Sequence, residues 1–193
     1  MSTRTFLALN VDDAVRRGVA RLAQQIGDLA DPDAKIHWVR QDNLHITLNF
    51  LGNVPDEILA DVCNSAAEVA AEFEPFDFHI RNLAAVPADG RQLRVFWLDI
   101  EDPTGRLVEL QRGLTDALVD LGMRPEARGY KPHLTLARVK YAPDADAIRQ
   151  VVAGFASADF GTQYADEVVV YSSVNSREGM VYAPIASAPL GAE

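Results

Sequence analysis

The sequence predicts an α+β fold of two pseudo-symmetric lobes, each an antiparallel sheet flanked by helices, with a central cleft between them. Three observations support this prediction. Segments with the alternation of a strand and segments with the period of a helix follow one another along the whole chain. Their order in the first half largely recurs in the second half. No low-complexity tract or long linker separates the halves, so we expect them to pack together with a ligand-sized cleft at their junction.

In the first half, helices are expected where apolar residues recur every three or four positions, and strands where short apolar runs end at turn-forming residues. Asp12 and Asp13 precede the first helical pattern and are expected to cap it. Gly52 to Pro55 leads into the second helix. The expected strands are 5–11, 37–39, 44–50 and 76–83, and the expected helices run from 12–13 towards 29 and from 55 to about 73.

Pro87-Ala-Asp-Gly90 predicts a hairpin-like connection to a strand at 95–100, which is the last element of the first half. Asp102-Pro103 opens the next helix, and Gly122 is expected to end it, because glycine is the preferred residue just after a helix. The remaining expected elements are a loop entering a strand over 128–139, a helix at 144–155, and strands at 168–174 and 180–189.

Composition limits the class of protein. The 193 residues are 48% hydrophobic and 24% charged, as in an ordinary globular protein. The formal net charge of −10 argues against a broad electrostatic grip on duplex nucleic acid, which requires many Lys and Arg contacts to phosphate. Cys63 is the only cysteine, so no internal disulfide is possible. The apolar run 5–11 is too short to span a membrane and lacks a cleavage pattern, which predicts a cytoplasmic protein with no membrane association.

A matched pair of His-x-Thr motifs is the strongest functional signal. Leu44-His45-Ile46-Thr47-Leu48 in the first half corresponds to Pro132-His133-Leu134-Thr135-Leu136 in the second. With four histidines and seven threonines in the chain, roughly 0.15 such pairs are expected by chance. One motif alone would be read as a half-exposed strand with ordinary polar residues, but two motifs in corresponding places favour a shared function.

The motifs suit acid–base chemistry on a phosphate. Side chains alternate along a strand, so each motif presents an imidazole and a hydroxyl on one face, with alpha carbons roughly 7 Å apart. If the lobes are related by an approximate two-fold axis, His45 and His133 approach a phosphorus atom from opposite sides, as in-line displacement requires. Imidazole titrates near neutrality, so one ring can act as base and the other as acid. No metal or cofactor is expected, because this chemistry needs no Lewis acid.

These residues resemble the 2H phosphoesterase superfamily, in particular its bacterial and archaeal RNA 2′,3′-cyclic phosphodiesterases, once called 2′-5′ RNA ligases. The resemblance includes Phe6-Leu-Ala-Leu, Trp38-Val39, Phe50-Leu51-Gly52 and Lys131-Pro-His-Leu-Thr-Leu-Ala-Arg138, and covers nearly the whole chain. It implies a single 2H phosphoesterase domain over 1–193, made of two intertwined lobes.

The resemblance also implies an activity and its residues. RNA ends with a 2′,3′-cyclic phosphate would be hydrolysed to a 2′-phosphate, with His45 as proton donor to the 3′ oxygen and His133 as proton acceptor. From the sequence symmetry alone, either imidazole could play either part. Thr47 and Thr135 are expected to hydrogen-bond the phosphate. The family usually has Phe where Tyr130 stands in Arg128-Gly-Tyr130-Lys-Pro-His133, which is a conservative difference.

Five further residues are candidates for substrate binding. Arg128, Lys131 and Arg138 could supply local positive charge for the RNA end, or Lys131 and Arg138 could simply be solvated. Phe50 or Tyr130 could stack on the terminal base, although for Phe50 the sequence favours core packing on its strand.

The sequence leaves other readings open. His37 and His79 have no Thr two positions later and are expected to be ordinary histidines. The same site could join a cyclic-phosphate end to a 5′-hydroxyl in a 2′-5′ linkage, act on another small cyclic phosphate, or bind nucleotides without turnover. The expected partners are RNA 3′ ends or nucleotides that carry a 2′,3′-cyclic phosphate, and the chain is expected to be a monomer.

Overall fold

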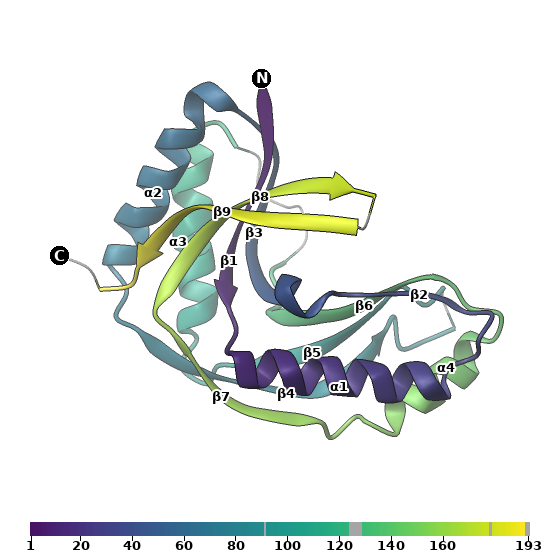
Figure 1. Cartoon of the computed structure of the whole chain (residues 1–193). Helices are drawn as coiled ribbons and strands as arrows, with labels where there is room; N and C mark the ends of the chain where they lie inside the picture. Colours follow the sequence, from purple (N-terminus) through teal and green to yellow (C-terminus); the bar gives the residue numbers. More distant parts are fainter. Residues whose placement is uncertain (91, 124–128, 178, 192–193) are drawn as a thin grey trace.

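The computed structural model describes residues 1–90, 92–123, 129–177 and 179–191. Figure 1 shows two groups of strands and helices that meet near the middle of the molecule. The strands are β1 (Ser2–Asn10), β2 (Lys35–Trp38), β3 (His45–Pro55), β4 (Phe76–Val86), β5 (Val95–Glu101), β6 (His133–Tyr141), β7 (Asp159–Ala165), β8 (Glu167–Ser176) and β9 (Gly179–Pro189). The helices are α1 (Asp13–Leu29), α2 (Leu59–Ala71), α3 (Arg106–Asp120) and α4 (Ala145–Ala153), with short 3-10 turns η1 (Gln41–Asn43) and η2 (Asp56–Ile58).

The strands form a sheet in the order β7-β4-β5-β6-β3-β1-β8-β9, and β2 pairs with the far end of β6. Neighbouring strands are antiparallel. The two strands that carry the His-x-Thr motifs, β3 and β6, are adjacent and pair at Ile46 and Leu134. The sheets of the two predicted lobes are therefore joined through the motif strands.

Two helices cover each half of the sheet. In Figure 1, α2 and α3 lie side by side next to β8, β9 and β3, whereas α1 and α4 lie against β4, β6 and β7. Each half includes a helix that follows a strand of the other: α1 follows β1, and α3 follows β5. Within the described ranges, no helix has both the length and the apolar character that crossing a membrane requires.

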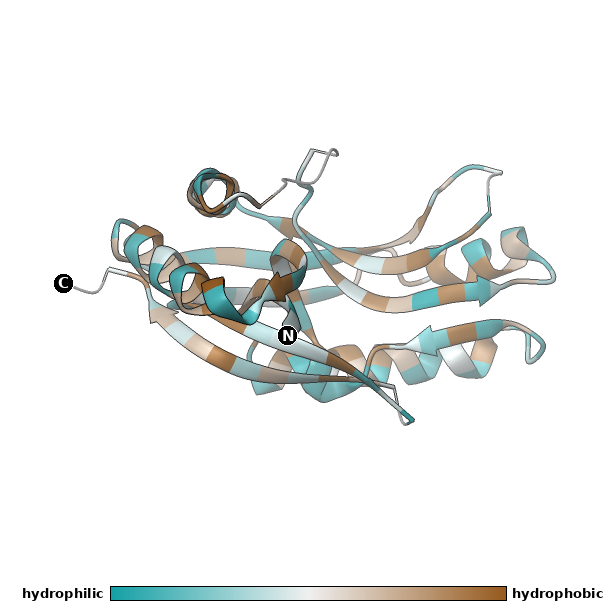
Figure 2. Cartoon of the chain, turned by 90° about the horizontal axis from the view of Figure 1, so that it is seen from above, coloured by the Kyte–Doolittle hydropathy of each residue, from teal (hydrophilic) through white to brown (hydrophobic). Residues whose placement is uncertain are grey.

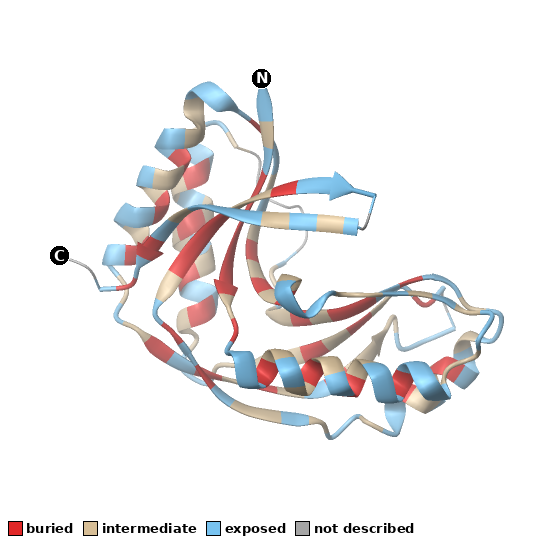
Figure 3. Cartoon of the chain, in the orientation of Figure 1, coloured by how far each residue is buried: buried red, intermediate tan, exposed pale blue. Residues whose placement is uncertain are grey.

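The core lies between the helices and the sheet. Figure 3 shows buried residues at regular intervals along α1, and these are Val15, Val19, Leu22 and Ile26, spaced as one face of a helix requires. Figure 2 shows the matching alternation of hydrophobic and hydrophilic residues along the strands. Residues 5–9 of β1 are buried without alternation, as expected for a strand covered on both faces.

The predicted helices and strands are present with shifted ends, but β7 is missing from the prediction. Its sequence, Asp159 to Ala165, is interrupted by Gly161, and only Phe160, Thr162 and Tyr164 favour a strand. It forms because β4 pairs with it and because the buried Gln163 binds the start of α1. Gln163 Nε2 donates to the Asp12 carboxylate at 3.1 Å, and the Asp12 N–H donates to Gln163 Oε1 at 2.8 Å. Asp12 does occupy the N-cap position, but its side chain binds Gln163 instead of capping the helix.

Two glycines of α1 test how closely this helix packs. A Cβ added at Gly18 would lie 2.9 Å from the Phe160 ring on β7, whereas one at Gly27 would make ordinary 3.6 Å contact with Trp38. Alanine favours a helix over glycine by about 0.5–1 kcal/mol, so Gly27→Ala should raise the free energy of unfolding by about that amount. At Gly18 the steric overlap should cancel or reverse the gain. Urea unfolding of both variants checks this, and equal stabilisation by the two would contradict the tight α1–β7 contact.

Candidate active site

His45 opens β3 with both ring nitrogens engaged. Its Nδ1 lies 2.7 Å from the backbone oxygen of Asn43, and its Nε2 lies 2.9 Å from Thr47 Oγ1. A carbonyl oxygen only accepts, so Nδ1 carries the proton. In the neutral ring, Nε2 then accepts from the Thr47 hydroxyl, and Nε2 is the nitrogen available for proton exchange.

His133 opens β6 and repeats the first of these bonds. Its Nδ1 lies 2.8 Å from the backbone oxygen of Lys131, two residues earlier, as Asn43 is two residues before His45. The backbone just before each strand thus sets the tautomer and the direction of each ring. Both motifs therefore leave Nε2 as the unprotonated nitrogen of the neutral ring.

The β3–β6 pairing brings the two motifs together. Ile46 and Leu134 are register partners and both are fully buried. Continuing the antiparallel register by one residue places His45 across from Thr135, and Thr47 across from His133. Because side chains alternate, these four share the face opposite to Ile46 and Leu134, on strands about 4.8 Å apart. The predicted approximate two-fold relation therefore holds locally for the backbone.

The surroundings of the two histidines differ. Burial lowers the pKa of His45 to about 4, because charging the ring would cost solvation. The positive charges of Arg16, Arg138 and, when protonated, His133 lower it further, and the hydrogen bond to Asn43 opposes the shift only in part. In the unliganded protein near neutral pH, His45 is therefore an uncharged ring beside fixed positive charge. Such a place favours a bound anion.

Two hollows flank the motifs. A cavity of about 440 Å³, a volume suited to a small ligand, is lined by Thr47 and His133 together with residues 48–51 of β3 and the second half of α3. A hollow of about 30 Å³, roughly the space of one water molecule, is lined by His45, Arg16 and Tyr182 among others. The two histidines are linked through Thr47, which lines the larger cavity with His133 and whose hydroxyl lies 2.9 Å from His45 Nε2.

Both histidines are surrounded by aromatic residues that the sequence alone does not predict to lie there. The Phe6 ring lies 4.8 Å from the His45 ring, and Tyr182 meets His45 edge-on at 5.3 Å. Trp97 lies 4.6 Å from His133 between ring centroids. Phe6 belongs to the family-like segment Phe6-Leu-Ala-Leu, but no neighbouring residue in the sequence indicates that its ring faces His45. Strand pairing of β1, β5 and β9 decides these contacts.

Tyr130 and Lys131, two of the candidate substrate-binding residues, make contacts within the protein. The Tyr130 hydroxyl donates to the backbone oxygen of Thr47 at 3.1 Å, and burial raises its pKa well above the usual value. Lys131 Nζ lies 3.1 Å from a carboxylate oxygen of Asp99 and 5.0 Å from the centre of the Trp97 ring. Both residues also line the larger cavity. They secure the segment that enters β6.

The other candidate substrate-binding residues differ in position. Arg138 is exposed, and its charge acts on His45. Phe50 is 45% exposed, with its ring 5.8 Å from Phe6, so it is not the core residue that the alternative interpretation required. Arg128 lies outside the described residues.

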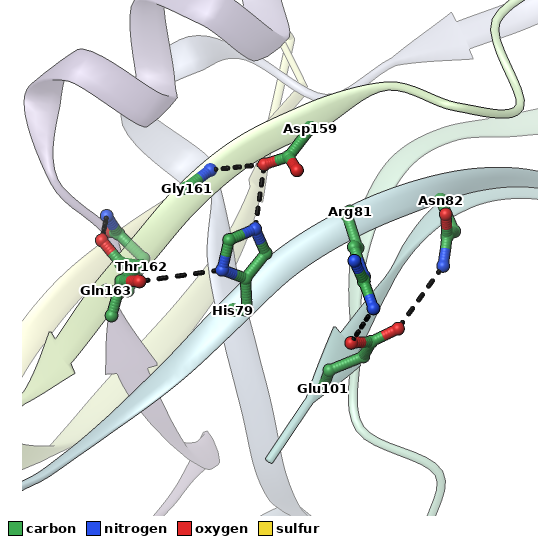
Figure 4. A network of polar contacts seen from close by, with 8 residues as sticks. All are labelled: His79, Arg81, Asn82, Glu101, Asp159, Gly161, Thr162 and Gln163. Carbon is green, nitrogen blue, oxygen red and sulfur yellow. Dashed lines mark hydrogen bonds and ion pairs between the residues drawn. The ribbon is translucent and has the colours of Figure 1, made fainter. Parts of the chain in front are cut away.

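His37 and His79 lie apart from the motif pair. His79 Nε2 lies 2.8 Å from the Asp159 carboxylate, in the polar network of Figure 4, which also contains an ion pair between Arg81 and Glu101. This network belongs to β4, β5 and β7. His37 is exposed on β2. Within the described part of the chain, the hydrogen bonds of His45 and His133 involve neither His37 nor His79.

Comparison with known sequences gives a consistent family. The family model described as the 2′-5′ RNA ligase superfamily matches residues 11–176. The RNA 2′,3′-cyclic phosphodiesterase of Methanothermobacter thermautotrophicus is 34% identical over 94% of this chain and 96% of its own length. The protein of the same name from Archaeoglobus fulgidus is 31% identical over 93% of this chain and 96% of its own length.

Solved structures share the fold. The Thermus thermophilus protein TT0787 superposes with a TM-score of 0.81 at 24% identity, covering 98% of this chain and 99% of that one. Escherichia coli LigT, in its complex with 3′-AMP, gives 0.79 at 23% identity with the same coverage. The arrangement of strands and helices described above is therefore that of known proteins.

The lowered pKa of His45 predicts a stability effect. The unfolded chain, with a histidine pKa near 6.5, binds a proton that the folded chain resists down to about pH 4. Stability should therefore fall as the pH drops through this window, and roughly 2 kcal/mol should be lost by pH 4.5 through this group alone. His45→Gln should lose less than the wild type in urea titrations at pH 7 and 4.5. His37→Gln controls for removing an exposed imidazole, and parallel losses in wild type and His45→Gln would contradict the burial argument.

Proposed function

The chain belongs to the 2′-5′ RNA ligase superfamily, and from this membership and the geometry of its two motifs we propose that it hydrolyses RNA 2′,3′-cyclic phosphate ends to 2′-phosphates. The observation that carries the proposal is the paired arrangement of His45 and His133. Each ring is held by a carbonyl two residues earlier, and each motif adds a threonine on the same face. The relatives named RNA 2′,3′-cyclic phosphodiesterase, aligned over most of the chain, support the choice of substrate.

The proposed reaction is a single in-line displacement. Nε2 of His133 takes a proton from water as the water oxygen bonds to phosphorus. The bond from phosphorus to the 3′ oxygen breaks, and Nε2–H of His45 gives its proton to that oxygen. The product carries a 2′-phosphate and a free 3′-hydroxyl, and proton exchange with solvent restores both rings.

His45 must be charged before it can donate. Its pKa of about 4 belongs to the unliganded protein, and the negative charge of a bound phosphodiester raises the pKa of a neighbouring imidazole. Substrate binding would then bring the proton that the reaction uses. Thr47, whose hydroxyl lies 2.9 Å from His45 Nε2, and Thr135 would turn their hydroxyls to the non-bridging oxygens.

Substrate contacts follow from the placement of the remaining candidates. Arg138 would supply positive charge for the RNA end, and Arg128, which lies outside the described residues, would do so on the sequence prediction alone. The charge of Lys131 is already engaged by Asp99 and contributes less. The exposed ring of Phe50 lines the larger cavity and offers a stacking surface for a base, whereas Tyr130 is half-buried. We further propose that the protein acts as a monomer in the cytoplasm, where its single Cys63 would stay reduced.

The direct test is incubation with an oligoribonucleotide that ends in a 2′,3′-cyclic phosphate, in the presence of EDTA. A 2′-phosphate product is expected, because the proposed steps need only the two imidazoles. Product mapping by phosphomonoesterase treatment and mass spectrometry identifies the end. A 3′-phosphate, or no product, would defeat the proposal, and a 2′-5′-joined product with added 5′-hydroxyl RNA would favour ligation.

The same assay tests the two histidines. His45→Ala and His133→Ala should each lower turnover by roughly 10²-fold to 10⁴-fold. His79→Ala removes an imidazole from the separate β4–β7 network and is the matched control. Circular dichroism and urea unfolding confirm that the variants fold. Wild-type turnover in either motif variant would remove that histidine from the reaction.

The assignment of donor and acceptor has its own test, because pH profiles do not distinguish the two assignments. A nucleoside 2′,3′-cyclic phosphate whose bridging 3′ oxygen is replaced by sulfur expels a thiolate at the same position, and a thiolate leaves without being protonated. With this substrate, His45→Ala should recover most of the lost rate relative to wild type, whereas His133→Ala should stay slow. The reverse pattern would exchange the roles of the two residues.

A further inference from the structure

The residue two positions before each histidine makes two contacts that bear on the position of the ring. Its backbone carbonyl accepts the Nδ1–H of the histidine, and its own side chain reaches across to another strand. In the first half this residue is Asn43, and in the second half it is Lys131. The two side chains are chemically unrelated, yet the arrangement recurs in both halves.

In the first half, the Asn43 amide donates to the backbone oxygen of Met180 on β9 at 2.7 Å. The Asn43 N–H also donates to the Arg40 carbonyl at 2.8 Å within η1. The carbonyl that orients His45 therefore belongs to a residue tied both to its own turn and to the β8–β9 hairpin.

In the second half, the Lys131 side chain lies between two groups of β5. Nζ is 3.1 Å from Asp99 Oδ1, as an ion pair without the alignment of a hydrogen bond, and 5.0 Å from the centre of the Trp97 ring. Trp97 in turn contacts the His133 ring at 4.6 Å. Asp99 is also the register partner of His133, so the contact of Lys131 with β5 is connected to the histidine through strand pairing as well.

Residues 129–132 have no strand or helix hydrogen bonding of their own. The Tyr130 hydroxyl holds this segment to β3, and the Lys131 side chain holds it to β5. A solvent-exposed ion pair adds little to stability, and the Lys131 side chain is 61% exposed. Its effect here is geometric, because the same residue carries the carbonyl that aims His133. Small errors in the aim of a reacting group cost rate more than they cost binding.

We propose that Asn43 and Lys131, with Asp99 and Trp97, are positioning residues that aim the Nε2 atoms of the two histidines. The inference rests on the proposed function for its kinetic consequences. It reassigns Lys131, which the sequence suggests as a substrate-binding residue, to the orientation of His133.

The two possible roles of Lys131 predict different effects of the Asp99→Asn substitution on kcat and KM. If Lys131 orients His133, Lys131→Met and Asp99→Asn should each lower kcat about 3-fold to 10-fold and leave KM within about two-fold. The double variant should be no slower than the slower single variant, because both remove one interaction. If Lys131 binds substrate phosphate instead, Lys131→Met should raise KM, and Asp99→Asn should lower KM by releasing the lysine. That second pattern would overturn the inference.

Two variants control this test. Lys131→Arg keeps the cation and should restore kcat to near the wild-type value. Asp159→Asn makes the same change from carboxylate to amide on β7, where the partner is His79, and should leave kcat unchanged. Figure 4 shows that Asp159 belongs to a separate network. A loss of kcat in Asp159→Asn equal to that in Asp99→Asn would show a general charge effect and contradict the positioning role of the contact between Lys131 and Asp99.

Asn43 gives the independent test in the other half. Asn43→Ala and the nearly isosteric Asn43→Asp both lose the donor to the Met180 carbonyl, so both should lower kcat about 3-fold to 10-fold with KM little changed. Asn43→Gln, which keeps an amide donor, should be less impaired than Asn43→Asp. Equal kcat in all three variants and the wild type would exclude a positioning role for the Asn43 side chain.

Nuclear magnetic resonance separates this inference from the proposed function. The Nδ1–H protons of His45 and His133 can be observed with selectively labelled histidine, without any substrate. Lys131→Met and Asp99→Asn should speed exchange of the His133 proton and leave that of His45 unaltered, and Asn43→Ala should do the reverse. Unaltered exchange in all three would refute the positioning role even in an active enzyme. An inactive wild type with these exchange effects would refute the proposed function alone.

Discussion

The pairing of β3 with β6 at Ile46 and Leu134 is the constraint on which the rest of the site depends. These two strands join the two halves of the sheet, and each strand begins at the histidine of its motif. A shift of one residue in either strand would turn its histidine and threonine into the core and expose its apolar residues. The cost of burying these polar groups protects the register, so the core that joins the halves also holds the motifs on one face.

The symmetry of the backbone does not extend to the surroundings. His45 is covered by Phe6 and Tyr182 and is neutral in the unliganded protein, whereas His133 stands at the edge of the larger cavity beside Trp97. Two chemically identical side chains with the same carbonyl bond thus differ in solvation. Because this difference leaves His45 uncharged in the unliganded protein, its proposed role as donor depends on the bound phosphodiester raising its pKa.

Charge is arranged locally in an acidic chain. The net charge of −10 would repel a polyanion at long range, and screening at physiological salt limits that repulsion to about 8 Å. Arg16 and Arg138 act electrostatically on His45, so positive charge is present at the site itself. A substrate that engages the protein only at its terminal phosphate fits this distribution, whereas a long duplex would meet the acidic surface.

The sequence by itself determined the order of most elements, the face shared by His45 and Thr47 and by His133 and Thr135, and the family, because strand alternation and repeated motifs are local patterns. It did not predict β7, the burial of His45, or the contacts of Lys131 with Asp99 and Trp97. Only the tertiary structure decided these, because β7 is held by β4 and by Gln163 rather than by its own propensity. Likewise, solvation and charge around an imidazole depend on strands that are distant in sequence.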